Sequence, residues 1–150
     1  MSHHSFQSPL GDLTVFEDKG NLVALEWGWV DGGDDVALLQ DTERQLDEYF
    51  EGRRKTFDLP LAPDGSSFQR KVWSAMRRIP YGSVSSYGTL AHEIDSAPRA
   101  VGGACGRNPL PIIIPCHRVL AAGGSLGGYS GFDGLETKRF LLALEGWTGP

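Results

Sequence analysis

The chain has 150 residues, the length of one ordinary domain or of a small domain packed on a smaller one. Its 40% hydrophobic and 22% charged residues are close to globular averages, which excludes extensive disorder. No apolar stretch approaches the roughly 20 residues of a membrane span, and no secretory leader is recognisable, so we expect no membrane partner. Two cysteines, Cys105 and Cys116, are too few for a disulfide framework and are typical of the reducing cytoplasm.

The net charge of −5 conceals an uneven distribution. Residues 1–65 contain 14 Asp and Glu against 5 Lys and Arg, which gives −9. Residues 66–150 contain 9 Lys and Arg against 5 Asp and Glu, which gives +4. Such a chain can hold a polyanion with one part and repel it with the other, although an acidic surface beside an ordinary basic one gives the same count.

The first part of the chain predicts strands followed by a helix. Strand-forming residues extend from Ser5 to Trp29 and are divided by turn signals at Ser8–Gly11 and Asp18–Asn21. Apolar residues at helical spacing predict an amphipathic helix over Ala37–Phe50. The proline-rich stretch Leu59–Gly65 then breaks regular structure and marks the expected domain boundary.

The second part predicts mainly helices with glycine-rich joints. Ser66–Ser67 can cap a helix that ends at Pro80–Gly82. A short helix follows Ser85–Ser86, and a third extends from about Ala97 to Arg107 with a proline in its first turn. This helix pair, with a basic second member rich in small residues, fits a helix-turn-helix. A last amphipathic helix is expected over residues 135–145.

A Cys-His pair follows an apolar run that contains three prolines. Prolines restrict the backbone, so Cys116 should be held in one position. A thiol reacts as its thiolate, and the imidazole of His117 together with the Arg118 guanidinium would lower the pKa of the thiol. A buried structural cysteine beside a core histidine fits the same dipeptide, because adjacency in sequence is not hydrogen-bond geometry.

Motifs throughout the second part resemble the O6-alkylguanine-DNA alkyltransferases of the stand-alone bacterial type. Arg-Ala-Val-Gly-Gly at Arg99–Gly103 begins seventeen residues before the cysteine of Pro-Cys-His-Arg-Val at Pro115–Val119. The resemblance extends from about Ser66 to Gly146. Further matches are Ser86–Gly88, Arg107–Pro109, Gly128–Gly131 and Leu141–Gly146.

The resemblance implies a two-domain α/β (α+β) protein. Residues 1–65 would form a small ribonuclease H-like domain with a β-hairpin or sheet and a helix. Residues 66–150 would form a mainly helical DNA-binding and alkyl-acceptor domain with a winged-helix-like helix-turn-helix. The implied protein is a cytoplasmic monomer that repairs DNA by direct reversal of damage.

The same resemblance assigns the chemistry. Cys116 would accept the alkyl group from guanine O6 and be consumed, with alkylated thymine as a further candidate substrate. His117 would draw the thiol proton through a water, and Glu145 would orient the imidazole, which is the logic of a nucleophile–base–orienter triad. Tyr87 would donate to guanine N3 as the base departs.

Four further residues would bind the alkylated guanine. Ser130 would lie beside O6, Tyr129 would pack over the pocket, and backbone groups at Val119 would contact the guanine edge. Asn108 would tie the turn after the recognition helix to the cysteine segment.

The implied partner is double-stranded DNA that contains alkylated guanine and is bound from the minor groove. A base inside a duplex cannot reach a buried thiol, so the nucleotide must leave the stack. The small residues Ala100, Gly102, Gly103 and Ala104 would let the recognition helix approach closely. Arg99 would fill the gap left by the extruded base, and Arg107 lies on the same helix.

We expect neither a metal nor another cofactor. Some relatives carry a structural zinc near the N-terminus, but no cysteine is present there. His3 and His4 are expected to be disordered or artificial additions. Cys105 is expected to be a small packing side chain.

Two other function classes remain open. One is a thiol hydrolase that uses Cys116 and His117 and has no need of a helix-turn-helix. The other is a non-catalytic relative that binds the lesion without accepting the alkyl group, and such relatives usually have tryptophan in place of the acceptor cysteine.

Overall fold

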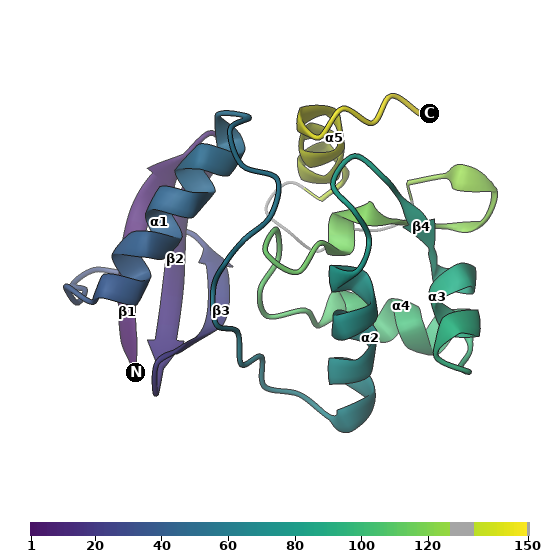
Figure 1. The fold of residues 1–150 in the computed structure, drawn as a ribbon, viewed down its shortest axis with the longest axis horizontal. Coiled ribbons are helices and arrows are strands. Elements are labelled where there is room, and N and C mark those ends of the chain that lie inside the picture. Colours follow the sequence, from purple (N-terminus) through teal and green to yellow (C-terminus); the bar gives the residue numbers. More distant parts are fainter. Residues whose placement is uncertain (127–133, 150) are drawn as a thin grey trace. The chain divides into compact units, whose positions relative to one another are not determined.

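The computed structural model describes residues 1–126 and 134–149 (Figure 1). The chain forms two compact units, Met1–Asp64 and Gly65–Pro150. A three-stranded sheet with one helix makes up the first unit, and helices dominate the second. This architecture confirms the predicted α/β class.

The first unit is an antiparallel meander with a helix packed against it. Strands β1 (Ser2–Ser8), β2 (Gly11–Asp18) and β3 (Asn21–Trp27) pair in chain order. Helix α1 (Ala37–Phe50) contacts β1 and β2 and has the bounds that its apolar periodicity predicts (Figure 1).

A tight turn fixes the register of β2 against β3. It is made by Lys19 and Gly20, whose φ angles are 52° and 86°. Two successive residues with positive φ form a turn whose twist matches that of antiparallel strands, and glycine adopts this conformation without steric cost. The turn signal at Asp18–Asn21 therefore predicts this turn correctly.

Apolar residues of the strands and of α1 form the core of the first unit. Leu13 and Val15 are fully buried and point to the same face of the sheet, because alternate residues of a strand share a face. The helical period buries Leu39, Leu46 and Tyr49 in the same way. Removal of this apolar surface from water stabilises the unit by about 25 cal/mol per Å².

The proline-rich segment after α1 runs beside β3. The Leu22 amide donates to the Pro60 carbonyl at 2.8 Å, and the Ala62 amide donates to the Leu22 carbonyl at 2.8 Å. The segment predicted to break regular structure therefore bonds to the sheet before the second unit begins.

The N-terminal histidines belong to β1, so the expectation that they are disordered is wrong. His3 pairs with Phe16 and His4 pairs with Val15. His4 Nε2 lies 2.5 Å from Glu43 Oε1 of α1. The pairing with β2 gives this terminus backbone partners that composition alone does not reveal.

Three helices contact one another in the second unit: α2 (Ser67–Arg77), α3 (Tyr87–Glu93) and α4 (Pro98–Gly106). A short turn joins α3 to α4, and Asp95 within it has a φ of 56°. Pro98 stands in the first turn of α4, where its missing N–H leaves no helical bond unmade. This packed pair is compatible with the predicted helix-turn-helix.

The remaining elements of the second unit surround the cysteine segment. A 3-10 helix at Cys116–Arg118 leads into β5 (Val119–Leu120), which pairs in parallel with β4 (Ser85–Ser86). A second 3-10 helix spans Ala122–Gly124. Helix α5 (Leu135–Leu144) contacts the first 3-10 helix (Figure 1).

Helix α2 begins at a complete capping box. Ser66 Oγ accepts from the Gln69 amide at 3.1 Å, and Gln69 Oε1 accepts from the Ser66 amide at 2.9 Å. At the other side of the helix, Trp73 is buried and its Nε1 donates to the Ala104 carbonyl of α4 at 2.8 Å. The cap and this bond fix where α2 starts and how it lies on α4.

Substitution Ser66→Ala should lower the free energy of unfolding by about 1 kcal/mol, because the Gln69 amide at the start of α2 loses its partner, Ser66 Oγ. Urea denaturation would measure the change. Ser74→Ala is the matched control, since Ser74 is exposed within the same helix and should change stability little. Equal effects of the two substitutions would contradict the role of the cap.

Candidate active site

The segment before Cys116 is tightly fixed by its own backbone and by Asn108. Asn108 Nδ2 donates to the Ile114 carbonyl at 2.8 Å, and Asn108 Oδ1 accepts from the Leu110 amide at 2.9 Å. Ile112 is buried with a φ of 75°, a conformation that β-branched residues rarely adopt. The prolines and these bonds together leave Cys116, which is half-buried, with one backbone position.

His117 and Glu145 form a buried pair beside this cysteine. His117 Nε2 lies 2.7 Å from Glu145 Oε2, and both side chains are fully buried. A carboxylate only accepts, so Nε2 carries the proton and Nδ1 is the unprotonated nitrogen of a neutral ring. Nδ1 is buried with no hydrogen-bond partner among the described residues. The ring therefore presents a free basic nitrogen from within the protein.

Arg118 binds both oxygens of the Glu145 carboxylate. Its Nε donates to Oε1 at 2.8 Å and its Nη2 donates to Oε2 at 3.0 Å, while Nη1 donates to the Ile79 carbonyl at 2.7 Å. This two-pronged contact suits the planar guanidinium. The contact with Glu145 is not apparent from the sequence, and the effect of Arg118 on the pKa of the Cys116 thiol stays a prediction.

Burial keeps His117 neutral. Removal from water is the largest cause and lowers the pKa of His117 below its ordinary value of 6.5. The hydrogen bond to Glu145 opposes this shift, whereas the positive charges of Arg118 and Lys138 add to it. At neutral pH the ring is therefore a base rather than a cation.

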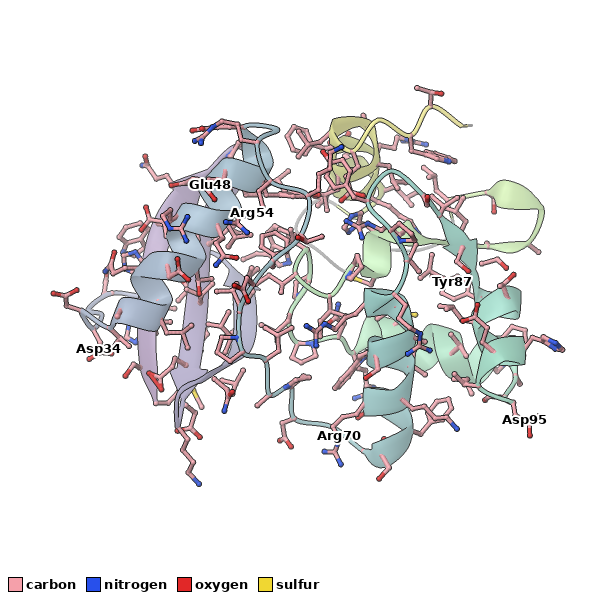
Figure 2. All side chains as sticks on the ribbon, viewed as in Figure 1. Asp34, Glu48, Arg54, Arg70, Tyr87 and Asp95 are labelled. Atoms are coloured by element: carbon pink, nitrogen blue, oxygen red, sulfur yellow. The ribbon has the colours of Figure 1, made fainter. Side chains whose placement is uncertain are left out.

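Tyr87 lies at the start of α3 (Figure 2). Burial raises the pKa of Tyr87, and negative charge on Cys105 and Cys116 raises it further. The phenol consequently stays protonated and able to donate at neutral pH.

Cys105 is a packing residue, as predicted. It is buried in α4 with its Sγ 3.3 Å from Met76 Sδ of α2. Burial raises the pKa of this thiol to about 12, so it is inert as a nucleophile at neutral pH.

The outer face of α4 is open and lined by small residues. Val101, Ala104 and Cys105 are buried, which leaves the opposite face to solvent. A Cβ atom added at the glycines of this face would meet nothing within 4 Å. Ala104 is buried, so the expectation that it contributes to a close approach to DNA is wrong. The other predicted DNA-contacting residues are exposed or half-exposed: Arg99, Ala100, Gly102 and Gly103 of α4, and Arg107 directly after it.

Two further predicted residues, Tyr129 and Ser130, lie outside the described residues. Val119 is fully buried, and its carbonyl accepts from Lys138 Nζ at 2.8 Å.

Two features of the site are not predicted from the sequence: the burial of Lys138 and the contact of Arg118 with Glu145. A signal for Lys138 exists, because it shares its helical spacing with the buried Leu141 and Leu142.

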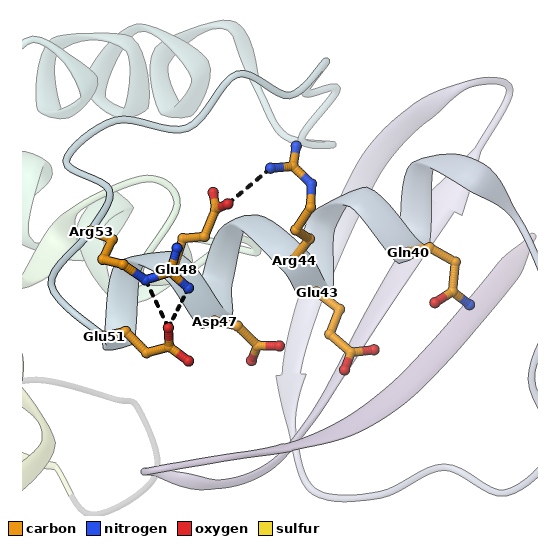
Figure 3. A pocket seen from close by; sticks show the side chains of 7 residues that line it. All are labelled: Gln40, Glu43, Arg44, Asp47, Glu48, Glu51 and Arg53. Carbon is orange, nitrogen blue, oxygen red and sulfur yellow. Dashed lines mark hydrogen bonds and ion pairs between the residues drawn. The ribbon is translucent and has the colours of Figure 1, made fainter.

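Within the described part of the chain we searched for metal-binding groups, for membrane-spanning helices and for clusters of charge. No group of three or more His, Cys, Asp or Glu there is placed to hold a metal ion. No helix there is both long and apolar enough to cross a bilayer. Acidic side chains do gather over α1, where Figure 3 shows them beside arginines that form ion pairs with Glu48 and Glu51.

Comparison with known proteins places both units in one family. The DNA binding domain of 6-O-methylguanine DNA methyltransferase matches residues 67–147, and its ribonuclease-like domain matches residues 1–63. The chain is 52% identical over 157 residues to the methylated-DNA–protein-cysteine methyltransferase of Mycolicibacterium paratuberculosis, covering 97% of the chain and 92% of the relative. It is 43% identical over 152 residues to the constitutive enzyme of that name from Bacillus subtilis, covering 93% and 92%.

Solved structures show the same fold. A crystal structure of Mycobacterium tuberculosis OGT in complex with DNA matches with a TM-score of 0.87 and 40% identity, covering 95% of this chain and 91% of that one. A 6-O-methylguanine DNA methyltransferase from Methanococcus jannaschii matches with a TM-score of 0.71 and 28% identity, covering 98% and 95%. These matches extend over both parts of the predicted fold.

The buried His117 should make stability depend on pH. Because its pKa is lowered in the folded state, the unfolded chain binds more protons as the pH falls below about 6.5, and stability is lost in that direction. In His117→Gln, the slope of unfolding free energy against pH should be smaller by up to about 1.4 kcal/mol per pH unit. Urea denaturation between pH 8 and pH 5 would measure both slopes.

The matched control for this measurement is His92→Gln, because His92 is exposed on α3. This control should keep the wild-type slope. If His117→Gln also kept it, the ring would have to be charged or accessible in the folded protein.

Proposed function

Because the chain belongs to the 6-O-methylguanine DNA methyltransferase family, we propose that it repairs DNA by moving an alkyl group from guanine O6 to Cys116. The observation that carries this proposal is the buried neutral base at His117, the residue after the cysteine, which contacts Glu145, while Arg118 holds Glu145 in place. Such a base gives the thiol a proton acceptor in a place that bulk water does not reach.

The proposed reaction is a single displacement at the alkyl carbon, from guanine O6 to the sulfur of Cys116. The Cys116 proton passes through a water to His117 Nδ1. The thiolate sulfur forms a bond to the alkyl carbon while the bond between that carbon and guanine O6 breaks. The electron pair stays with the guanine, and Tyr87 donates a hydrogen bond to N3 of the departing base. The raised pKa of Tyr87 supports this role, because a protonated phenol is required.

Glu145 and Arg118 make the proton transfer feasible within the buried site. Burial of a lone carboxylate is costly, and three donors from the histidine and the arginine satisfy this one. When His117 takes up the thiol proton, its new positive charge lies 2.7 Å from a carboxylate that is already oriented toward it. The imidazolium is therefore stabilised without movement of either side chain.

The proposed substrate is double-stranded DNA bound from the minor groove. Helix α4 supports this choice, because its glycines leave room for close approach and Arg99 is exposed at its start. Arg99 would occupy the space of the extruded base, and Arg107 would contact phosphate. The predicted guanine contacts of Tyr129 and Ser130 belong to the same proposal.

One copy of the chain supplies the nucleophile, the base and the orienting carboxylate. We therefore assign the activity to a monomer. Cys116 must stay a free thiol to react, so a reducing compartment such as the cytoplasm suits the protein.

Incubation with an oligonucleotide that contains O6-methylguanine should add one methyl group to Cys116 and then stop, because a thioether has no good leaving group. Intact mass and peptide mapping would locate the added group. Cys116→Ala should abolish the transfer while it still binds the lesion. Turnover well beyond one equivalent would contradict the proposal and would favour a thiol hydrolase.

Arg99→Ala should slow transfer from double-stranded DNA more than transfer from single-stranded DNA. A single strand has no pair or stack to replace, so a residue that fills a vacated position has little to do there. Single-turnover rates on both substrates would show the difference. Arg107→Ala is the control, because loss of a phosphate contact should weaken binding to both, and an equal defect in Arg99→Ala would make Arg99 a phosphate contact too.

A further inference from the structure

The loop between α2 and β4 reaches the end of α5 (Figure 1). Within this loop the Ser83 amide donates to the Pro80 carbonyl at 3.0 Å, and Gly82 has a φ of 82°. A β-turn with this φ favours glycine at its third position. A Cβ atom added to Gly82 would lie 3.2 Å from the Glu145 carbonyl oxygen, so the turn packs closely against the end of the helix. Tyr81, the second residue of the turn, is thereby held beside that end.

The hydroxyl of Tyr81 binds the backbone at the end of α5. Tyr81 Oη donates to the Leu144 carbonyl at 3.2 Å, although the two residues are 63 positions apart. The last four carbonyls of a helix have no partner within the helix, and this bond satisfies one of them. Burial raises the pKa of Tyr81, and negative charge on Glu145 raises it further, while Arg118 acts in the opposite direction. The phenol is therefore protonated at neutral pH and can hold the residue immediately before Glu145.

The ring of Tyr81 lies against Arg118. Arg118 Cζ is 5.8 Å from the centroid of the ring, a distance at which a guanidinium is attracted to an aromatic face. The same guanidinium donates through Nη1 to the Ile79 carbonyl at 2.7 Å, two residues before Tyr81. Its Nε and Nη2 donate to the two carboxylate oxygens of Glu145. The loop therefore holds Arg118 at two points, and Arg118 holds the carboxylate.

Glu145 stands where a helix is least constrained by its own bonds. It follows Leu144, the last residue of α5, and helix ends commonly fray. Its side chain is nevertheless fully buried and lies 2.7 Å from His117 Nε2. The contacts that Tyr81 makes to Leu144 and to Arg118 support this position from the backbone side and from the carboxylate side.

We propose that Tyr81 is a positioning residue of the methyl-transfer site, which keeps the Glu145 carboxylate aimed at His117. It does so by binding the Leu144 carbonyl with its hydroxyl and the Arg118 guanidinium with its ring. This inference rests on the proposed function, because the orientation of His117 affects the reaction only if its ring accepts the thiol proton.

The first test follows the His117 ring by NMR in protein labelled with 15N-histidine and requires no DNA. The Nε2 proton of wild-type His117 should resonate far downfield, because it lies in a buried hydrogen bond to Glu145, and its absence in His117→Gln identifies the signal. In Tyr81→Leu, which removes both the ring and the hydroxyl, this signal should shift upfield or be lost through exchange with water. An unchanged signal in Tyr81→Leu would overturn the inference.

The second test measures single-turnover methyl transfer at saturating DNA. Tyr81→Leu should slow the transfer about tenfold and leave DNA affinity unchanged. Tyr81→Phe keeps the ring and loses only the bond to Leu144, so it should slow the transfer about threefold. A wild-type rate in Tyr81→Leu would contradict the positioning role. If the wild-type protein itself transferred no methyl group, the proposed function would fail, and the NMR signal would still decide how Tyr81 affects His117.

A double-mutant cycle separates positioning from packing. If the ring of Tyr81 acts through Arg118, it should have little effect in Arg118→Lys, which lacks the planar guanidinium. In that background Tyr81→Leu should slow transfer about threefold, the effect of the lost hydroxyl, rather than about tenfold. A full tenfold effect of Tyr81→Leu in both backgrounds would show that the ring is only structural.

Ile94→Ala is the matched control for lost stability. It removes a buried apolar side chain directly after α3 and should lower the melting temperature while the His117 signal keeps its wild-type position. A signal that moves equally in Ile94→Ala and Tyr81→Leu would overturn the inference. If Tyr81→Leu does not fold, Tyr81→Phe decides, since it removes a single oxygen atom, and a wild-type signal and transfer rate in Tyr81→Phe would then count against the proposal.

Discussion

The site depends on one buried carboxylate shared between two donors. Glu145 accepts from His117 at Oε2 and from Arg118 at both carboxylate oxygens. Removal of either donor would leave a buried charge poorly compensated, which typically costs 3–5 kcal/mol. The protein therefore holds its base in place with a contact whose loss also destabilises the fold. Function and stability are coupled at this carboxylate.

This coupling explains why the last helix matters to a site that lies far before it in the sequence. Cys116, His117 and Arg118 form a single turn that has too few residues to bury itself. Helix α5 provides the buried surroundings, through Leu141 and Leu142 and through the charged ends of Glu145 and Lys138. The chemistry of the thiol is thus set by residues more than twenty positions away.

The local elements of this protein are predictable, whereas the partners of its charged side chains are not. Helix α1 follows from apolar spacing, and α2 follows from the Ser66 cap, because both signals are local. The order of His4 is not predictable from the sequence, because its strand exists only through pairing with β2. Arg118 lies next to His117 in the sequence, yet only the fold decides that its guanidinium meets Glu145. A contact between residues far apart in the sequence produces no periodic pattern of residue types from which it could be predicted.

The positive φ of Ile112 has a consequence for how the protein meets its substrate. A buried β-branched residue in this conformation stores about 1–3 kcal/mol of backbone strain, which the surrounding bonds must hold. The loop has consequently lost its conformational freedom during folding rather than during association. The conformational entropy that a mobile loop would lose when it binds a ligand has therefore been lost before binding. The nucleophile is preorganised, and free energy of association remains available for deforming the ligand.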